Sequence, residues 1–341
     1  RNAGPVINFM ATNMQTDTNA ITDNRQAWML RLLFICWLAT KFLSFNLWMG
    51  NRFFPLIPVN DLLLNIPALV HAILFWVAAG AMLLCLLRPI RALIIVIVVA
   101  ELLSCLLDQT RWQTWEYQFL FMAAAVLFFQ QKSFINTAWQ IILAALYFFS
   151  GLSKLNPAFI HDIWNSLLLR NWLGIQTNDV WVFRLGYLLP LIEMAAGAAL
   201  LSKRFYKPAI ILLTVMHLGI LYLFGPLGFN RNEVIWPWNL LMPVLLSGIF
   251  FRQPFQFDRM FFKRKFAFVL VLCWVILPML HMAGRWDHYL SFTLYSGGVP
   301  QLYICTDDAA ALQRMAPYMS NRRNGMIPCR YPVAAYDWGI K

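Results

Sequence analysis

Charged residues are scarce in this chain, at 12% of 341 positions, whereas hydrophobic residues make up 60%. A soluble domain is about 25% charged, and it needs that polar surface to cover its apolar side chains in water. The composition therefore excludes a soluble enzyme, a disordered protein and a soluble nucleic-acid-binding protein. The net charge of +12 does not by itself indicate a nucleic-acid partner, because chain topology explains it, as the connections below show.

Several motifs are also missing. The six cysteines include no Cys-x-x-Cys pair, which argues against a zinc or redox motif. None of the five histidines has a carboxylate four residues away, so we expect no metal site. No glycine-rich loop follows a strand pattern, so nucleotide binding has no support. The polar segment 1–27 lacks the apolar centre of a signal peptide.

Long apolar runs dominate the rest of the chain, and each is close to the length of about 20 residues that crosses a bilayer as a helix. The fourth and fifth runs are joined by a tight connection, which favours a helical hairpin. We therefore predict an all-α integral membrane protein with a polytopic bundle in residues 28–283, an N-terminal tail (1–27) and a C-terminal segment (284–341). The nine predicted spans are 28–48, 63–87, 90–107, 116–131, 134–153, 183–201, 208–225, 235–251 and 266–283.

The basic residues of the connections predict the orientation. The connections after the second, fourth, sixth and eighth spans carry eleven Lys and Arg, against six in the other connections, which are longer in total. The positive-inside rule assigns the basic set to the cytoplasm. The N-terminus is then cytoplasmic, and nine spans place the C-terminal segment outside the cytoplasm.

Ionisable residues inside predicted spans are candidates for function because burying them in lipid is costly. They are Lys41, His71, Glu101, Glu193 and His217. The alternative is that they pair with one another across the bundle or line a small wet cavity, with no role in chemistry.

Lys154 stands in the sequence YFFSGLSKLNP, where the fifth predicted span ends. The small residues Gly151 and Ser153 allow another helix or a ligand to come close. A lysine desolvated at such a place can act as a neutral-amine base. The alternatives are that Lys154 extends to the outer lipid headgroups, or that it is a structural partner of Asp108 or Glu101.

The third outer connection, 108–117, reads DQTRWQTWEY. Its Trp112, Trp115 and Tyr117 are typical of an interfacial aromatic belt. A second interpretation depends on a resemblance that this stretch shares with the segment around Lys154.

The segment from Tyr147 to Trp172, with its aromatic–Gly–x–x–Lys–Leu–Asn core, resembles the membrane part of the vitamin K-dependent γ-carboxylases. The wider group is the horizontally transferred transmembrane (HTTM) family of bacteria. Residues 108–117 are similar to the Asp-x-Thr-x-Trp-Asn-x-His-x-Tyr stretch of that family, and the resemblance covers roughly residues 28–295.

The resemblance implies that Lys154 is the catalytic base that deprotonates a hydroquinone, with an isoprenoid quinone as the cofactor. It also implies a pocket for a quinone or another lipid-soluble ligand on the outer side of a bacterial inner membrane. The candidate pocket residues are Asp108, Trp112, Trp115, Tyr117, Gly151, Asn156, Trp164, Glu193 and His217.

The chain departs from the family in two places. Trp115 occupies the position of the family's catalytic histidine, and a tryptophan cannot pass a proton. Only about 58 residues follow the last predicted span, which is too short for the family's β-rich substrate domain, so we expect a short or partial family member. Complete glutamate carboxylation is not expected. The alternatives are a non-catalytic lipid or quinone binder and a scaffold or accessory subunit of a membrane complex.

Two cysteines, Cys305 and Cys329, fall in the segment predicted to lie outside the cytoplasm, where a disulfide persists. The other four lie within predicted spans and are expected to be packing residues. If Cys305 and Cys329 pair, the unfolded protein should take up two more alkyl groups after reduction than before, measured by mass spectrometry. Equal masses with and without reductant would refute the pairing.

Overall fold

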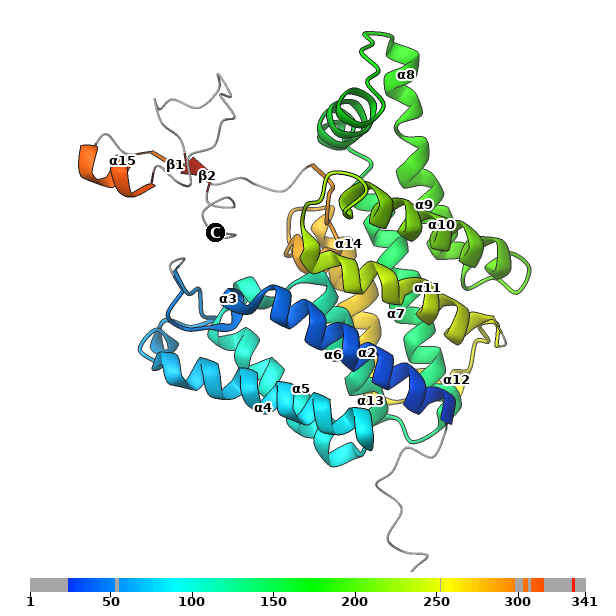
Figure 1. The fold of residues 1–341 in the computed structure, drawn as a ribbon. Coiled ribbons are helices and arrows are strands. Elements are labelled where there is room, and N and C mark those ends of the chain that lie inside the picture. Colours follow the sequence, from blue (N-terminus) through cyan, green and yellow to red (C-terminus); the bar gives the residue numbers. More distant parts are fainter. Residues whose placement is uncertain are drawn as a thin grey trace, which may run out of the picture.

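The computed structural model describes residues 24–52, 55–251, 253–297, 303–305, 308–315 and 333–334. The regular secondary structure of these residues is almost entirely helical (Figure 1). The exception is a short antiparallel pairing of β1 (Tyr303–Ile304) with β2 (Val333–Ala334) in the C-terminal segment. Cys329 lies outside the described residues, so its pairing with Cys305 stays a prediction.

Six helical segments are long and apolar enough to cross a membrane. The lengths and composition of these helices fit the prediction of a helical, multi-pass membrane protein. The six segments are Asn24–Leu43, Ala68–Leu87, Lys132–Ser153, Val180–Ala199, Tyr206–Phe224 and Glu233–Phe250.

The other three predicted spans are also helical, but they are shorter. The helix α5 (Arg91–Leu107) has 17 residues and α6 (Thr114–Phe128) has 15. The third segment, Lys265–His281, is also shorter than 18 residues. At a rise of about 1.5 Å per residue, such helices cover about 23–26 Å of a hydrocarbon core about 30 Å thick. By length and composition, six helical segments can therefore span a membrane. The nine-span topology stays a prediction.

The long helices form two groups, visible in Figure 1 as a blue-to-cyan set and a green-to-yellow set. The groups meet where α2 packs on α11 and α6 packs on α7. The first group consists of α2 (Asn24–Leu43), α4 (Ala68–Leu87), α5 and α6. The second group consists of α7 (Lys132–Ser153), α9 (Leu188–Ala199), α10 (Tyr206–Phe224) and α11 (Trp236–Phe250).

Shorter elements connect and extend these helices. One of them, the 14-residue π-helix η3 (Phe159–Trp172), falls where the sequence predicted only a connection. The others are α3 (Phe45–Trp48), η1 (Asp61–Leu63), η2 (Gln109–Arg111), α8 (Val180–Leu185), η4 (Glu233–Ile235), α12 (Arg259–Phe262), α13 (Lys265–Val271), η5 (Leu272–Ile276), α14 (Leu277–His281), η6 (Tyr289–Ser291) and α15 (Ala309–Met315).

The helix α7 lies in the middle of the bundle. In its apolar 18-residue stretch, 83% of the residues are buried inside the protein. The corresponding share for α10 is 28%, so most of the surface of α10 faces the surroundings. Trp139 of α7 donates its indole N–H to the carbonyl oxygen of Met122 of α6 at 2.9 Å. With only a three-residue connection between them, α6 and α7 form the predicted hairpin.

Small residues bring the backbones of α7 and α9 into contact. A Cβ atom added at Gly151 would lie 2.5 Å from the backbone nitrogen of Met194 and 2.6 Å from the carbonyl oxygen of Pro190. One added at Gly197 of α9 would lie 2.5 Å from the backbone nitrogen of Phe148. This close approach, typical of helices that pack through small residues, places Glu193 beside the end of α7.

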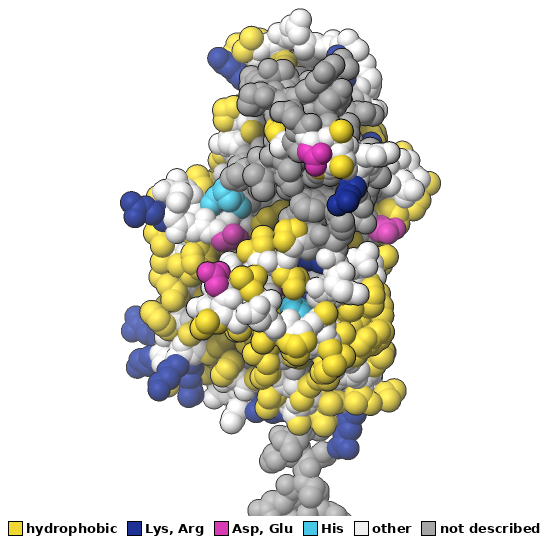
Figure 2. Space-filling view, turned by 90° about the vertical axis from the view of Figure 1, so that its left-hand side faces the viewer, with side chains coloured by type: hydrophobic (Ala, Val, Ile, Leu, Met, Phe, Trp, Pro, Cys, Tyr) yellow, Lys and Arg dark blue, Asp and Glu magenta, His cyan; other side chains and the backbone are white. Residues whose placement is uncertain are grey.

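The four basic connections lie at one end of the bundle, together with the start of α2. On the face drawn in Figure 2, a group of Lys and Arg side chains lies along the lower edge of a broad hydrophobic surface, and other Lys and Arg side chains lie higher on the molecule, where the acidic side chains also occur. Four contacts join these connections: Gln26 Nε2 to the Lys132 oxygen (3.1 Å), Arg31 Nη2 to the Leu87 oxygen (3.2 Å), the Phe129 ring to the Phe261 ring (5.0 Å) and Lys207 Nζ to the Phe251 ring (5.8 Å).

Gly151→Ala should destabilise the protein by about 1–3 kcal/mol, because the added methyl group forces α7 and α9 apart. The matched control is Gly219→Ala in α10, where an added Cβ meets nothing within 4 Å. That change should leave stability equal or raise it by up to about 1 kcal/mol, as alanine favours helix. Thermal unfolding in detergent compares the two, and equal melting temperatures would contradict the close α7–α9 packing.

Candidate functional site

Lys154 directly follows α7, and its amine faces the bundle. The Nζ atom lies 2.8 Å from Ser150 Oγ, one turn earlier, and 3.0 and 2.7 Å from the two carboxylate oxygens of Glu193. The side chains of Lys154 and Glu193 are only 14% and 9% exposed. A lysine amine has three N–H donors, and all three have acceptors here. The amine is thus tied to a carboxylate and a hydroxyl group in this structure, and its role as a base stays a prediction.

A second set of polar side chains lies two turns deeper on the same face of α7. Tyr147 precedes Lys154 by seven residues, and this spacing places both on one side of a helix. The Tyr147 hydroxyl lies 2.6 Å from His217 Nε2, and His217 Nδ1 lies 2.7 Å from Asn239 Oδ1. With the amide oxygen of Asn239 as acceptor, His217 carries its proton on Nδ1 and accepts from Tyr147 at Nε2. The chain of three links α7, α10 and α11 inside the second group.

Asn156 and Trp164 have structural contacts beside Lys154. Asn156 Oδ1 accepts a hydrogen bond from the backbone N–H of Phe159 at 2.9 Å, which caps the start of η3. Asn156 Nδ2 donates to the carbonyl oxygen of Ser296 at 3.0 Å and so ties the C-terminal part to this end of α7. Trp164 Nε1 donates to the carbonyl oxygen of Val182 at 2.8 Å, which holds η3 against α8.

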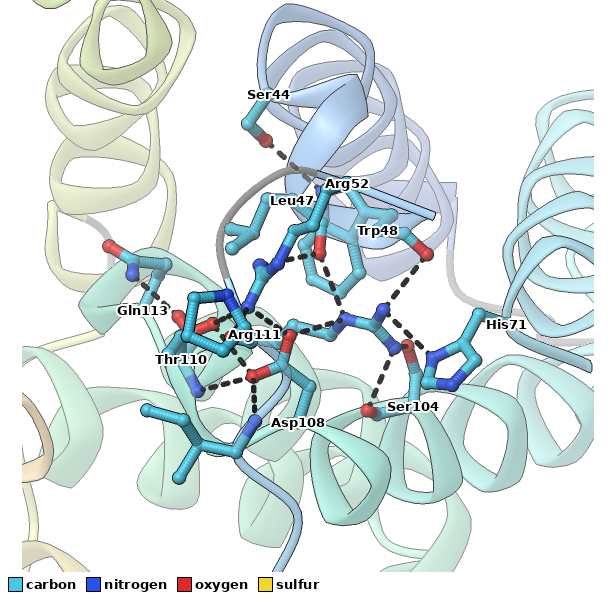
Figure 3. Close-up of polar contacts among 12 residues, drawn as sticks. Ser44, Leu47, Trp48, Arg52, His71, Ser104, Asp108, Thr110, Arg111 and Gln113 are labelled. Atoms are coloured by element: carbon cyan, nitrogen blue, oxygen red, sulfur yellow. Dashed lines mark hydrogen bonds and ion pairs between the residues drawn. The ribbon is translucent and has the colours of Figure 1, made fainter. Parts of the chain in front are cut away.

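Arg111 organises a second polar cluster, in the connection between α5 and α6 (Figure 3). Its Nε donates to the carbonyl oxygen of Leu47 (3.0 Å), and its Nη1 donates to the carbonyl oxygen and hydroxyl of Ser104 (3.1 and 2.9 Å). Its Nη2 donates to the carbonyl oxygen of Trp48 and contacts His71 Nδ1, both at 3.0 Å. The guanidinium is fully buried, and its planar fork reaches α3, α4 and α5 at once.

Asp108 supplies the negative charge that faces the two arginines of this cluster, Arg52 and Arg111. Its carboxylate lies 2.7 Å from Arg52 Nη2 and 3.6 Å from Arg111 Nε, and it accepts from the Thr110 hydroxyl at 2.8 Å. Burial lowers the pKa of the guanidinium groups of Arg52 and Arg111, while the negative charge of Asp108 raises both. Asp108 therefore helps to keep two buried arginines charged, and it makes no described contact with Lys154.

The aromatic residues of the 108–117 stretch pack into the core. Trp115 and Tyr117 are buried inside the protein, so they are not exposed members of an interfacial belt. The Tyr117 ring stacks on Trp274 at 5.0 Å between centroids, and Trp115 lies 6.0 Å from Trp48. Trp112 is half-buried and meets the edge of Tyr117 at 6.0 Å.

The sequence candidates thus divide between the two groups of helices. Gly151 and Glu193 lie at Lys154, and His217 lies two turns deeper, whereas Asp108, Trp112, Trp115 and Tyr117 lie in and around α5 and α6. Hollows on the described surface include one of about 400 Å³ between α2 and α11 and one of about 530 Å³ on α4. Neither is lined by Lys154 or by a candidate pocket residue. Among the described residues, no group of three or more His, Cys, Asp or Glu is placed to hold a metal ion.

The sequence did not predict that Arg111 organises a buried cluster, because a single arginine in a connection was used only to predict the orientation. It also did not predict the contact of Asn239 with His217. It also missed Glu116, which is fully buried in α6. A signal for Glu116 was present, because it is the only charged residue of the predicted span 116–131. An acid alone in an apolar run needs a partner, and the structure supplies one.

Comparison of the chain with protein-family models, with curated proteins and with solved structures finds no match. The resemblance to the γ-carboxylases and the HTTM family therefore stays a prediction, carried by the motifs around Lys154 and in residues 108–117.

Arg111→Lys should lower stability by about 3 kcal/mol or more, since one amine cannot reach the acceptors on three elements and each buried group left unpaired costs about 1–3 kcal/mol. The same substitution at the exposed Arg170 serves as the control and should change little. Thermal unfolding in detergent measures both. A similar melting temperature for the two variants would show that the buried cluster does not stabilise the fold.

Proposed function

We propose that the chain is a multi-pass membrane protein that binds a lipid-soluble molecule with a weakly acidic hydroxyl group, of the isoprenoid hydroquinone type, at Lys154 and Glu193. The observation that carries the proposal is the ion pair between these side chains, 2.7 Å apart and 14% and 9% exposed, at the end of the central helix. Charged groups at the margin of a membrane bundle are costly to retain, so their presence favours a functional role. Their residual exposure gives a ligand access.

The chemistry of the pair suits a hydroxyl group that ionises. The Glu193 carboxylate accepts the proton of the hydroquinone oxygen, and the Lys154 ammonium stabilises the negative charge left on that oxygen. The ligand oxygen enters between the two side chains and replaces their direct contact. This assigns the base to Glu193 and the positive charge to Lys154, because the amine is already paired with a carboxylate. The motif shared with the γ-carboxylases supports the same class of ligand.

The position of Lys154 supports a site on the outer side of the membrane. The helix α7 begins at Lys132, at the basic end of the bundle, and Lys154 follows its other end. The positive-inside rule assigns the basic end to the cytoplasm and so assigns Lys154 to the outer side. We place the protein in a bacterial inner membrane on the basis of the HTTM resemblance.

A second function, as a scaffold or accessory subunit of a membrane complex, is favoured by a different observation. All three donors of the Lys154 amine already have acceptors within the protein, so the amine has no free donor for a ligand while the pair is closed. In this alternative the ion pair only holds α7 against α9, and the lipid-facing surface contacts other subunits.

A short-chain hydroquinone and its quinone, added separately to the purified protein in detergent, test the first proposal. Ligand binding to the folded state raises the melting temperature. We expect the hydroquinone to raise it in the wild type, and we expect Lys154→Met and Glu193→Gln to abolish the increase. Lys263→Met, at an exposed position of the basic end, is the matched control and should keep it.

Two results would overturn the proposal: no increase in the wild type, or the same increase in all variants. A purely structural pair has its own signature. Each single variant then melts lower, and Lys154→Met combined with Glu193→Met recovers most of the loss, since removing both buried charges costs less than removing one.

A further inference from the structure

A third polar cluster lies deep between α2, α5 and α6, away from Lys154. Lys41 Nζ lies 2.7 Å from Glu101 Oε2, and the Trp37 indole N–H donates to Glu116 Oε2 at 2.6 Å. Lys41 and Glu116 are 0% exposed and Glu101 is 1% exposed. Lys41 Nζ also lies 3.0 Å from the centre of the Trp48 ring. The cluster is thus closed to solvent within the described residues.

The second oxygen of each carboxyl group has no partner. Glu101 Oε1 and Glu116 Oε1 are buried, and no donor in the described part of the chain reaches either atom. The two side chains are close enough for the charge of Glu101 to act directly on Glu116. Two ionised carboxylates have no hydrogen atom to share, and their like charges repel strongly in an apolar interior.

We infer that Glu101 and Glu116 hold one proton between their unpartnered Oε1 atoms and so form a proton-binding site inside the bundle. With this proton every polar atom of the cluster has a partner. Among the three ionisable side chains of the cluster itself the charges also balance, because Lys41 is positive, one carboxylate is negative and the second carboxyl group is neutral. Without the proton, two negative carboxylates lie side by side in an apolar surrounding and only Lys41 makes direct contact with them as a cation, which is strongly unfavourable.

The contacts decide which carboxyl group carries the proton. Glu101 Oε2 accepts from the Lys41 ammonium, which stabilises an ionised carboxylate, whereas Glu116 Oε2 accepts from a neutral indole. The proton therefore belongs to Glu116 Oε1, which donates to Glu101 Oε1. The other charged or titratable groups that face the pair are Cys105 of α5 and Arg111 of η2.

A proton suits the site better than a metal cation does. Hard cations such as Mg²⁺ and Ca²⁺ require about six or more oxygen ligands. Only two oxygens are free here, and the described residues include no group of three or more metal-ligating side chains. Two neighbouring carboxyl oxygens without another partner are sufficient to share one proton in a hydrogen bond.

The site is connected to the end of α5 by one polar face. Glu101, Ser104 and Asp108 are spaced three and four residues apart, which places them on one side of the helix. Ser104 binds Arg111 and Asp108 pairs with Arg52, whose side chain is 7% exposed. This face is the polar connection between the buried proton and the outer end of the bundle. The inference does not depend on the function proposed for Lys154, which lies in the other group of helices.

Infrared spectroscopy of the purified protein tests the inference directly, because a protonated carboxyl group has a carbonyl-stretch band distinct from that of a carboxylate. The wild type should show the band at neutral pH. Glu116→Gln should lose it and keep the melting temperature, since the amide N–H then donates to Glu101 Oε1 and the amide oxygen accepts from Trp37. Glu233→Gln, at an exposed position in η4, is the matched control and should keep the band.

A second variant checks the assignment independently. In Glu101→Gln the remaining carboxyl group becomes the counter-charge of Lys41 and loses its proton, so the band should disappear again. Absence of the band in the wild type, or its persistence in Glu116→Gln, would overturn the inference. A wild-type melting temperature that rises with added Na⁺ or Mg²⁺, and loses this response in Glu116→Gln, would replace the proton with a cation.

Discussion

Every buried charge in this bundle needs a partner within reach, and this requirement constrains how the helices pack. An isolated ion among apolar helices costs several kcal/mol, so its counter-charge must lie on a helix that packs directly against it. Glu101 and Glu193 each hold a lysine at 2.7 Å, one in each group of helices. Rotation or separation of these helices would leave the charges unpaired. The ion pairs therefore determine which helix faces pack together, in addition to stabilising the packed bundle.

The same interaction occurs at two depths with different consequences. The pair at Lys41 is closed to solvent and includes a second carboxyl group, so its chemistry concerns a proton that stays inside the protein. The pair at Lys154 lies at the end of a helix and is partly exposed, so a ligand can compete for it. Accessibility, rather than the kind of residue, distinguishes a candidate ligand site from a site for a retained proton.

Much of the fold was predictable because membrane helices depend on local properties. Apolar runs of sufficient length must be helical in lipid, where each backbone polar group needs a partner. All nine predicted runs are helical, although α5, α6 and the segment Lys265–His281 are shorter than the six that can span a bilayer by length. The helix η3 was not predicted, because its polar residues give no long apolar run.

The sequence by itself determined that the chain is a helical membrane protein, that its basic connections gather at one end, and that Lys154 follows a tight, small-residue turn of helix. Only the tertiary structure decided the partners: Lys154 meets Glu193 rather than Asp108 or Glu101, and Glu101 meets Lys41 and Glu116. The physical reason is that hydropathy and charge act along the chain, whereas pairing depends on which helix faces come together. Contacts such as that of Gly151 with Met194, forty-three residues away, set those faces.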